Sequence, residues 1–434
     1  LDPWIQGNLK DADFAAALAQ FTETIIEGMS KQALEGYVSW IGHKGTLKGR
    51  PHFDPFPFDG ELLFEGQLRA QIKQAAREKH TKAESFLKEH LLPQQEAIHR
   101  RWGIPNPYVC FLLADGDNMG NTLRKLKDHE QHQSLSQTLA GFTQEAREIV
   151  EGENTGSLLY SGGADILAAF SVDQALPCAK ALHDTFGTQM KAWLKGMGVD
   201  ITPPTLSMGI VIGHALAPMG DLLKLTRAME KKAKNGPRER CTPNRDGFAI
   251  AYTPLSGADV TFYQRWVPAV AAPAPGAGDV WPGDLYKKDP VQLLETLRAW
   301  LDDESIPHRS AFHLLGLRRE LASIYAGKDP MPVLAMTAEA ARVLGRKRGG
   351  RGAHLVEDDV HGALVGYLTW AVAEESAISP PPAKGAEAGP GEARPEAVLG
   401  ALERLVNGLL IARQLVTATR QRQGKTNQGE VNHE

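Results

Sequence analysis

The sequence predicts an α+β fold, with a βαββαβ unit in the middle of the chain and helical segments before and after it. Three observations support this prediction. The run "YVCFLLADG" predicts a buried strand ending in acids, "LLYSGGADILAAF" predicts two strands joined by a tight turn, and helical stretches connect these to the strand "TLSMGIVIGH". A basic helix and a short strand, "GFAIAY", follow. This order is the ferredoxin-like arrangement, which places the end of the first strand beside the hairpin turn in one antiparallel sheet.

The composition is that of an ordinary folded protein, and it excludes several classes. A chain of 434 residues has room for roughly two to four domains. The net charge of −4 gives no global signature of nucleic-acid binding, so any such contact must be a local patch. Three cysteines without a CxxC pair argue against a disulfide framework or a four-cysteine zinc site, and they favour a cytoplasmic location. No apolar run approaches the length of a membrane span, so we expect no membrane partner.

Changes of composition along the chain predict its segments. Glu65 to Trp102 is a long helical stretch that we expect to break at Pro93. "PAVAAPAPGAGDVWPG" has the composition of a linker, and "SPPPAKGAEAGPGEARPE" lacks the large apolar residues that packing needs. The predicted segments are a helical end of a preceding domain at 1–55, a helical connection at 56–106, the βαββαβ domain at 107–267, a linker at 268–283, and a helical C-terminal domain at 284–434 with a disordered loop near 379–396.

Acidic residues gather where the first strand ends and the hairpin turns. Asp115 and Asp117 stand at i and i+2, so both carboxylates can point to one side of the sheet edge. Gly162 and Gly163 form the bend, which lets another group approach the backbone closely, and Asp165 follows. Mg²⁺ prefers hard oxygen ligands and serves nucleotidyl transfer by bridging phosphates. Together the motifs predict a nucleotide pocket with a divalent ion, whereas each alone is more typical of acids that cap a helix or face solvent in a loop.

Four segments together resemble one family: "FLLADGDNMG", "LLYSGGADILAAF", "LSMGIVIGHALAPMGDLLKLTRAMEKKAKN" and "PFDGELLFEGQL". The family is the large subunit of type III CRISPR RNA-guided effector complexes of the Cmr (type III-B) kind, whose palm domain is of the nucleotidyl-cyclase type. The resemblance implies a palm that makes cyclic oligoadenylates from ATP, with Mg²⁺ or Mn²⁺, once guide RNA has paired with target RNA. It also implies other Cmr-type subunits as partners. The family's HD nuclease domain would precede these residues, and because the chain begins at Leu1 we expect a fragment without it.

The resemblance assigns roles to individual residues. Asp115 and Asp165 are the expected catalytic residues, and with Asp117 they are the expected metal ligands. The expected nucleotide-binding residues are Ser161, Gly162, Gly163, Lys231 and Lys234. Ala164 departs from the family, because the third position of its G-G-D-D signature is an aspartate that ligates metal in related cyclases. We therefore expect an impaired cyclase. Ala164 is compatible with a natural, silent scaffold or with an engineered Asp-to-Ala change, and the intact acids around it favour the second.

Several secondary motifs leave alternatives open. Lys231 and Lys234 could contact a triphosphate or belong to a solvated basic face. "GRKRGGRG" at 345–352 could bind RNA phosphates or be an ordinary surface loop. His183 and Asp184 resemble an HD pair, but they stand in the middle of a helix without further metal ligands, so we expect no nuclease site there. His129 and His132 lack a third ligand, and we interpret them as exposed polar residues.

Two other functions compete with an active oligoadenylate synthase. One is a catalytically silent scaffold that binds guide RNA, target RNA and partner subunits, with a pocket that holds ATP without turning it over. The other is a diguanylate cyclase, which usually carries an acid and then phenylalanine after the paired glycines. Here Ile166 follows Asp165 and long helical regions flank the palm, so the sequence disfavours that class.

Overall fold

The computed structural model describes residues 2–38, 56–58, 60–154, 156–198, 201–236, 245–255, 258–268, 289–325, 331–345, 358–378 and 392–423. The chain divides into two compact units, Leu1–Pro107 with Thr417–Glu434, and Tyr108–Val416. The start of the second unit lies one residue from the predicted start of the palm at 107. The predicted linker at 268–283 and the basic loop at 345–352 lie almost entirely outside the described residues. Of the predicted loop near 379–396, residues 392–396 are described and contribute a short strand and the start of a helix.

The first unit is helical and has its own aromatic core. Trp4, Phe14 and Phe21 are fully buried in it, and the Trp4 indole donates a hydrogen bond of 3.0 Å to the carbonyl of Trp102. The Asp11 side chain caps the second helix by accepting from the backbone N–H groups of its first turn. The elements are α1 (Asp2–Asn8), α2 (Ala12–Ser30), a 3₁₀ turn (Gly60–Leu63), α3 (Glu65–Arg77), α4 (Thr81–Phe86), a π-helical turn (Leu87–Leu91) and α5 (Leu92–Trp102).

The predicted break at Pro93 is confirmed in part, because a π-helical turn interrupts the regular α-helix directly before it and α5 begins at Leu92. The helical stretch is also interrupted earlier, after Arg77, where Lys79 adopts a left-handed conformation with φ 61°. Pro93 lies in the first turn of α5, directly after the π-helical turn. A proline in the first turn of a helix is tolerated because the N–H that it lacks would have no partner there.

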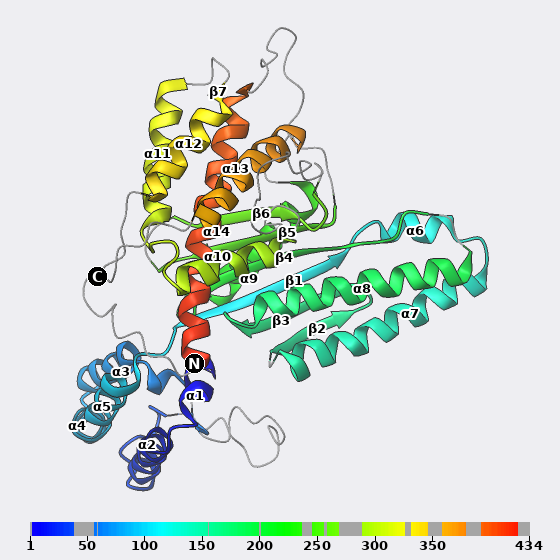
Figure 1. Ribbon diagram of the computed structural model, residues 1–434. Coiled ribbons are helices and arrows are strands. Elements are labelled where there is room, and N and C mark those ends of the chain that lie inside the picture. Colours follow the sequence, from blue (N-terminus) through cyan, green and yellow to red (C-terminus); the bar gives the residue numbers. More distant parts are fainter. Residues whose placement is uncertain are drawn as a thin grey trace. The chain divides into compact units, whose positions relative to one another are not determined.

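The second unit is built on a six-stranded sheet with the order β2-β3-β1-β4-β5-β6 (Figure 1). β1 (Tyr108–Gly116) pairs antiparallel with both β3 (Asp165–Ser171) and β4 (Leu206–His214). With β2 (Ser157–Gly162), these strands give the ferredoxin-like order, so the predicted fold class is confirmed. The sheet continues with β5 (Gly247–Thr253), which is parallel to β4, and with β6 (Val260–Arg265), a strand that the sequence analysis missed.

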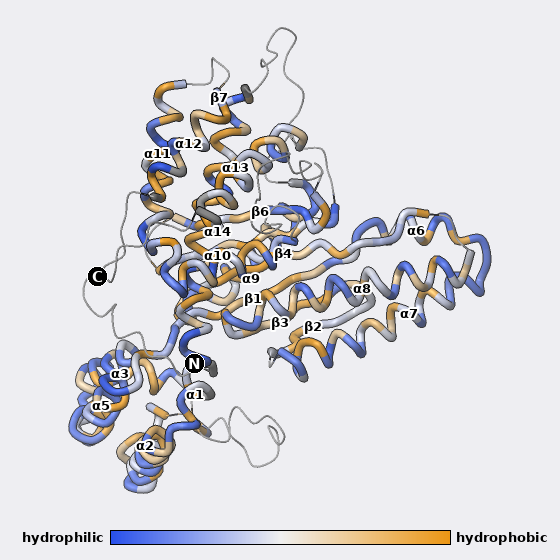
Figure 2. The backbone as a smooth tube through the Cα atoms, in the orientation of Figure 1, coloured by the Kyte–Doolittle hydropathy of each residue, from blue (hydrophilic) through white to orange (hydrophobic). Residues whose placement is uncertain are grey.

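Helices cover both faces of this sheet. The connections are α6 (Met119–Lys125), α7 (His129–Arg147), a π-helical turn (Glu148–Glu153), α8 (Ala175–Met197) and α9 (Met219–Asn235). Phe111 and Val211 pack with Met229 of α9 in one cluster. The alternate residues Leu112 and Ile210 are also fully buried, on the face where α8 contacts β1 and β4. Burial on both faces explains why Figure 2 shows β1 and β4 as hydrophobic along much of their length.

Helix α9 lies unusually close to the sheet because β4 and β5 present glycines to it. A Cβ atom on Gly209 would lie 2.2 Å from the backbone nitrogen of Glu230, and one on Gly247 would lie 2.0 Å from the carbonyl oxygen of Ala233. Neither position can therefore carry a side chain unless the helix shifts. The close approach fixes the last turns of α9 beside the end of β1.

The C-terminal part of the second unit is a group of helices beyond β6. Asn407 donates a hydrogen bond of 2.8 Å to the carbonyl of Thr261 and so ties the last helix to this strand. The elements are α10 (Pro290–Asp302), α11 (Ser310–Tyr325), β7 (Met331–Pro332), α12 (Val333–Gly345), α13 (Asp358–Ile378), β8 (Glu392–Ala393) and α14 (Pro395–Arg422), of which the second unit includes the part up to Val416. Within the described residues, no helix is long and apolar enough to cross a membrane.

Candidate active site at the hairpin edge

The bend between β2 and β3 lies against the end of β1. Gly162 pairs with Asp165, which leaves Gly163 and Ala164 as a two-residue turn. Gly163 has a φ of +66°, a conformation that a glycine adopts readily and that tight hairpin turns require. Ala164 is buried, and a Cβ atom on Gly116 would lie 2.5 Å from the Ala164 methyl. The turn can therefore touch the strand only because Gly116 has no side chain.

Four charged side chains come together at this edge. Lys234 forms ion pairs with Asp115 at 2.6 Å and with Glu230 at 2.8 Å. Ala114 pairs with Ile166, so the same register places Asp165 opposite Asp115. Burial raises the pKa of Asp165, and the neighbouring Asp115 raises it further, while Lys234 opposes the change. The cluster therefore contains three carboxylates, those of Asp115, Asp165 and Glu230, and only one lysine. This excess of negative charge favours a bound cation.

Asp117 makes its hydrogen bonds with residues outside that cluster. Its Oδ2 accepts hydrogen bonds from Thr205 at 2.8 Å, from Ser207 at 2.7 Å and from the backbone N–H of Asp246 at 2.9 Å. Strand β1 ends at Gly116, and Asn118 adopts a left-handed φ of 60°, so the alternation that would align Asp117 with Asp115 stops. The role of Asp117 as a metal ligand stays a prediction.

The second oxygen of Asp117 is the observation that keeps this prediction open. Burial raises the pKa of Asp117, and its Oδ1 is buried without a hydrogen-bond partner, 3.7 Å from a guanidinium nitrogen of Arg245. A buried oxygen without a hydrogen-bond donor is uncommon, and the Arg245 guanidinium is the cationic group that this oxygen faces. Mg²⁺ usually takes one or two protein carboxylates, so Asp115 and Asp165 fit a divalent ion even without Asp117. Among the described residues, no group of three His, Cys, Asp or Glu side chains is arranged around a common metal position.

The HD pair has a structural role. The His183 ring stacks on Trp266 with centroids 4.0 Å apart, and its Nε2 lies 2.8 Å from Asp246. Asp184 pairs with Lys180 at 2.9 Å and lies 3.3 Å from the other ring nitrogen of His183, Nδ1. The contact of His183 with Asp246 anchors the segment before β5 to α8. The same segment holds Asp117, because the backbone N–H of Asp246 donates to the Asp117 carboxylate.

The other predicted residues lie around the turn with fewer contacts. Lys231 is exposed, three residues before Lys234 on α9. The hydroxyl of Ser161 is buried without a hydrogen-bond partner. Sequence analysis missed Glu230, which holds Lys234, and Tyr160, whose hydroxyl would lie 2.4 Å from a Cβ atom on Gly162. An i, i+4 acid before a lysine was a readable signal for Glu230, whereas the position of Tyr160 depends on the register shift in β2.

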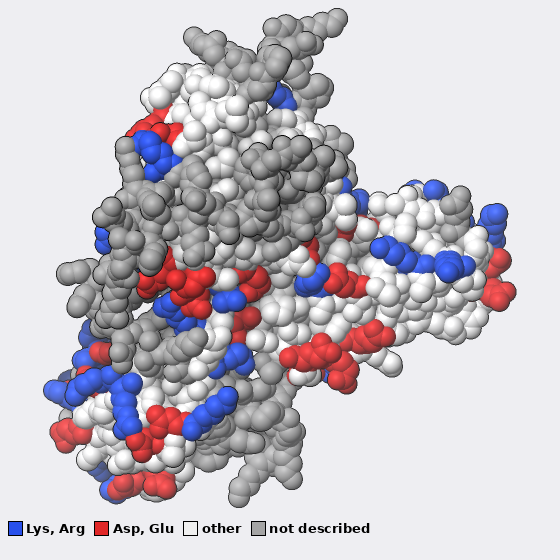
Figure 3. Space-filling model, in the orientation of Figure 1, with Lys and Arg blue, Asp and Glu red and all other residues white. Residues whose placement is uncertain are grey.

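His129 and His132 lie in the first turn of α7 and are exposed. On the face shown in Figure 3, acidic and basic side chains are interspersed over the described residues. The picture agrees with the small net charge of −4, so an RNA contact on this face would have to be local.

The fold and the site define a class of protein, a palm of the nucleotidyl-cyclase type, in which acids at the end of the first strand meet a glycine-containing hairpin. Residues 108–242 match the family described as Cas10/Cmr2, second palm domain. These residues of the palm are thus similar to the Cas10/Cmr2 family, the one that the sequence motifs indicated.

One curated protein and two solved structures are similar to parts of this chain. The CRISPR system Cmr subunit Cmr2 of Pyrococcus furiosus is 28% identical over 227 residues, which cover 46% of this chain and 24% of that protein. The match thus spans about a quarter of the length of that relative. A solved structure of Type III-B Cmr-beta bound to cognate target RNA aligns with 82% of this chain and 47% of its own, at 12% identity and a TM-score of 0.43. The adenylyl cyclase CyaB from P. aeruginosa aligns with 33% of this chain and 76% of its own, at 14% identity and a TM-score of 0.26.

Proposed function

We propose that this chain is the palm-bearing part of the large subunit of a type III-B CRISPR effector complex, and that its hairpin edge is a site for joining ATP into cyclic oligoadenylates. The observation that carries the proposal is the placement of Asp115 opposite Asp165, next to Lys234. The match of residues 108–242 to the Cas10/Cmr2 palm supports the choice of reaction class, and the Cmr2 relative supports the complex. Guide RNA, target RNA and other Cmr-type subunits are the partners that this proposal requires.

Each residue of the site has a distinct task in this proposal. Asp115 and Asp165 would hold Mg²⁺ or Mn²⁺, which supplies the charge stabilisation needed for in-line attack at a phosphate. Gly162 and Gly163 leave the backbone of the turn open, so triphosphate oxygens can approach its N–H groups. Lys234 is within reach of the same carboxylates and would turn from Asp115 toward the triphosphate. Lys231, exposed on the same helix, offers a second positive charge.

Ala164 limits what this site can do. Its methyl group faces the end of β1 and takes the place of the aspartate at the third position of the family's G-G-D-D signature. A methyl group cannot ligate a metal. The site then keeps groups that bind ATP but lacks one of the carboxylates that organise the reacting phosphates. We therefore infer that this chain holds ATP better than it cyclises it. The second candidate function, a scaffold that binds ATP without turnover, rests on the same residue.

The decisive experiment replaces Ala164 by aspartate. ATP turnover would be measured with Mg²⁺ or Mn²⁺ in the assembled complex, with and without target RNA. We expect the A164D form to make oligoadenylate on the order of a hundredfold faster than the Ala164 form, since a metal ligand contributes several kcal/mol to the barrier. Asp221→Asn is the matched control, because it removes an exposed acid of α9 and should leave turnover unchanged.

Two outcomes would contradict the proposal in different ways. If the A164D form makes no adenylate product under any of these conditions, the cyclase function is wrong and the scaffold function stands. If both forms are equally active, position 164 is not a metal ligand. Asp165→Asn in the A164D background tests the remaining carboxylate, and it should abolish the activity that A164D restores.

A further inference from the structure

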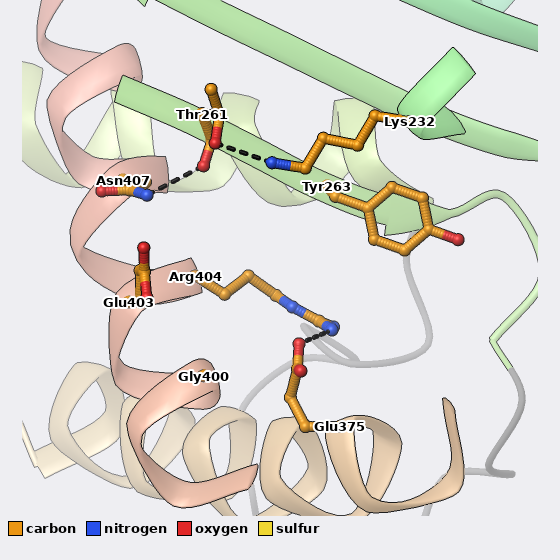
Figure 4. A pocket seen from close by; sticks show the side chains of 8 residues that line it. All are labelled: Lys232, Thr261, Tyr263, Glu375, Gly400, Glu403, Arg404 and Asn407. Carbon is orange, nitrogen blue, oxygen red and sulfur yellow. Dashed lines mark hydrogen bonds and ion pairs between the residues drawn. The ribbon is translucent and has the colours of Figure 1, made fainter. Parts of the chain in front are cut away.

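A polar pocket of 260 Å³ is lined by residues of α9, of β6 and of the C-terminal helices (Figure 4). Strand β6 contributes Thr261 and Tyr263 to its wall, and α9 contributes Lys232. Helices α13 and α14 supply the rest of the lining, which consists of Glu375, Gly400, Glu403, Arg404 and Asn407. All of these residues belong to the second compact unit.

The two carboxylates of the pocket already have cationic partners. Glu375 forms a buried ion pair with Arg404, and Glu403 pairs with Arg318 at 2.6 Å. Their negative charges are therefore largely compensated within the protein, so the carboxylates do not by themselves demand a ligand cation.

The two cations of the pocket, in contrast, have unused donors. Lys232 donates to the Thr261 hydroxyl at 2.8 Å, and among the described residues it makes no ion pair. Arg404 is 5% exposed, and its Nη1 is buried without a hydrogen-bond partner. An ammonium has three N–H donors and a guanidinium five, so both side chains have hydrogens left for a ligand. Buried donors without acceptors cost stability, and a ligand oxygen placed between them would recover it.

The orientation of the side chains gives one place for that oxygen. In Figure 4, Lys232 and Thr261 lie on one side of the pocket and Arg404 on the other, with Asn407 and Glu403 at the α14 end. Charge-assisted bonds from lysine and arginine to phosphate or carboxylate oxygens are among the stronger hydrogen bonds of proteins. Pockets that bind drug-sized molecules usually have volumes of about 300 Å³ or more. The pocket of 260 Å³ is smaller, so it suits a compact anion or a small molecule with an anionic group.

From these contacts, we propose that the pocket between Lys232 and Arg404 binds a small oxyanion, either a phosphate group or a carboxylate. The site is separate from the carboxylate cluster. Lys232 and Lys234 are two residues apart on α9, which is about 200° around the helix, so they face different sides. Because none of the residues of the pocket belongs to the hairpin edge, the proposal is independent of the proposed cyclase activity.

The test measures binding of inorganic phosphate to the full chain by isothermal titration calorimetry at constant ionic strength. Lys232→Met removes the charge but keeps an apolar stem, and we expect it to weaken phosphate binding about tenfold or more, the loss of one charge-assisted contact. Lys224→Met is the matched control, because Lys224 is exposed on the same helix and pairs only with Asp221 at the surface. This control should bind phosphate like the unmodified chain. Acetate as a competitor then separates a general oxyanion site, which it would occupy, from a site that takes only phosphate.

Three results would overturn the proposal. One is phosphate binding too weak to detect at millimolar concentration, and another is equal binding by the K232M form and the unmodified chain. The third is loss of binding in Lys234→Gln but not in Lys232→Met, because phosphate would then occupy the carboxylate edge. Thermal unfolding of each variant with and without phosphate gives a second readout, in which phosphate should raise the melting temperature of K232M less than that of the unmodified chain and of K224M.

Discussion

The two sides of α9 show how charge context decides what a lysine can bind. On one side, Lys234 pairs with Asp115 and Glu230 at the hairpin edge, where the carboxylates outnumber the lysine. On the other side, Lys232 is mostly buried, and burial lowers its pKa while Glu403 and Glu375 oppose the change. The first environment favours an additional cation, and the second favours an anion. Two identical residues, two positions apart, therefore belong to sites of opposite preference.

The largest effect that we expect in this comparison comes from removing Arg404. Arg404→Met removes the buried cation that pairs with the Glu375 carboxylate, which should destabilise the second unit by about 3–5 kcal/mol. Replacing both residues, with Glu375→Leu added, should recover most of that loss. Urea denaturation measures both values.

The control for this prediction is the pair of Arg318 with Glu403, which is partly exposed. Arg318→Met should cost only about 1 kcal/mol or less. If the R404M form is no less stable than the R318M form, the Glu375 carboxylate does not depend on Arg404 for its charge compensation. The difference in charge environment between the two sides of α9 would then be smaller than proposed.

A smaller effect should follow from changing the distance between α9 and the sheet, because that distance affects both sides at once. Gly209→Ala places a Cβ atom 2.2 Å from the Glu230 backbone, so the helix must shift, at a cost of about 1–3 kcal/mol. We also expect ATP binding to weaken, since Lys234 moves with the helix. Gly220→Ala in α9 is the control, because a Cβ atom added there meets nothing within 4 Å. The G220A form should be as stable as the parent or slightly more stable; unfolding curves in which both forms lose equal stability would contradict the close approach.

The smallest effect concerns Asp117 and depends on pH. Burial raises the pKa of this carboxyl above its ordinary value, so its contribution to stability is complete at low pH and is lost as the pH rises through the raised pKa. Asp117→Asn keeps an oxygen for the three donors and does not ionise. We expect the D117N form to be within about 1 kcal/mol of the parent near pH 4 and to gain relative stability toward pH 7.

Unfolding free energies across this range measure the difference between the two forms. A relative loss of stability of the D117N form as the pH rises would mean that the folded state favours the charged carboxylate, against the direction given by burial. The same variant also bears on the metal site, because loss of activity in A164D with D117N, at unchanged stability, would identify Asp117 as a ligand.

The fold could be predicted because its strands are buried on both faces and stand in a regular order with helices. The strand from Tyr108 to Gly116 and the hairpin around Gly163 carry their own local signals, namely apolar runs with turn residues between them. Strand β6 escaped prediction because "VTFYQR" is short and mixes polar with apolar residues. The prediction of a break at Pro93 missed the additional interruption after Arg77, where Lys79 adopts a positive φ that no local pattern indicates.

The site was predicted only as far as strand geometry extends. Asp115 and Asp165 meet because a strand register aligns them, and that register follows from the topology. Asp117 stands beyond the end of its strand, where alternation no longer applies, and its hydrogen bonds depend on residues far along the chain. The pocket around Lys232 could not be found from sequence, because its other cation, Arg404, comes from a helix that no local pattern connects to α9.

The glycines beneath α9 have a consequence for how these sites can change. A helix that rests on side chains can slide or rotate by repacking them, but α9 meets backbone at Gly209 and Gly247 and has no such layer there. Its rotational setting is therefore fixed, and Lys232 and Lys234 cannot exchange sides. Variation within this scaffold has to proceed by substitution at these positions and not by movement of the helix, so the two lysines can be altered one at a time.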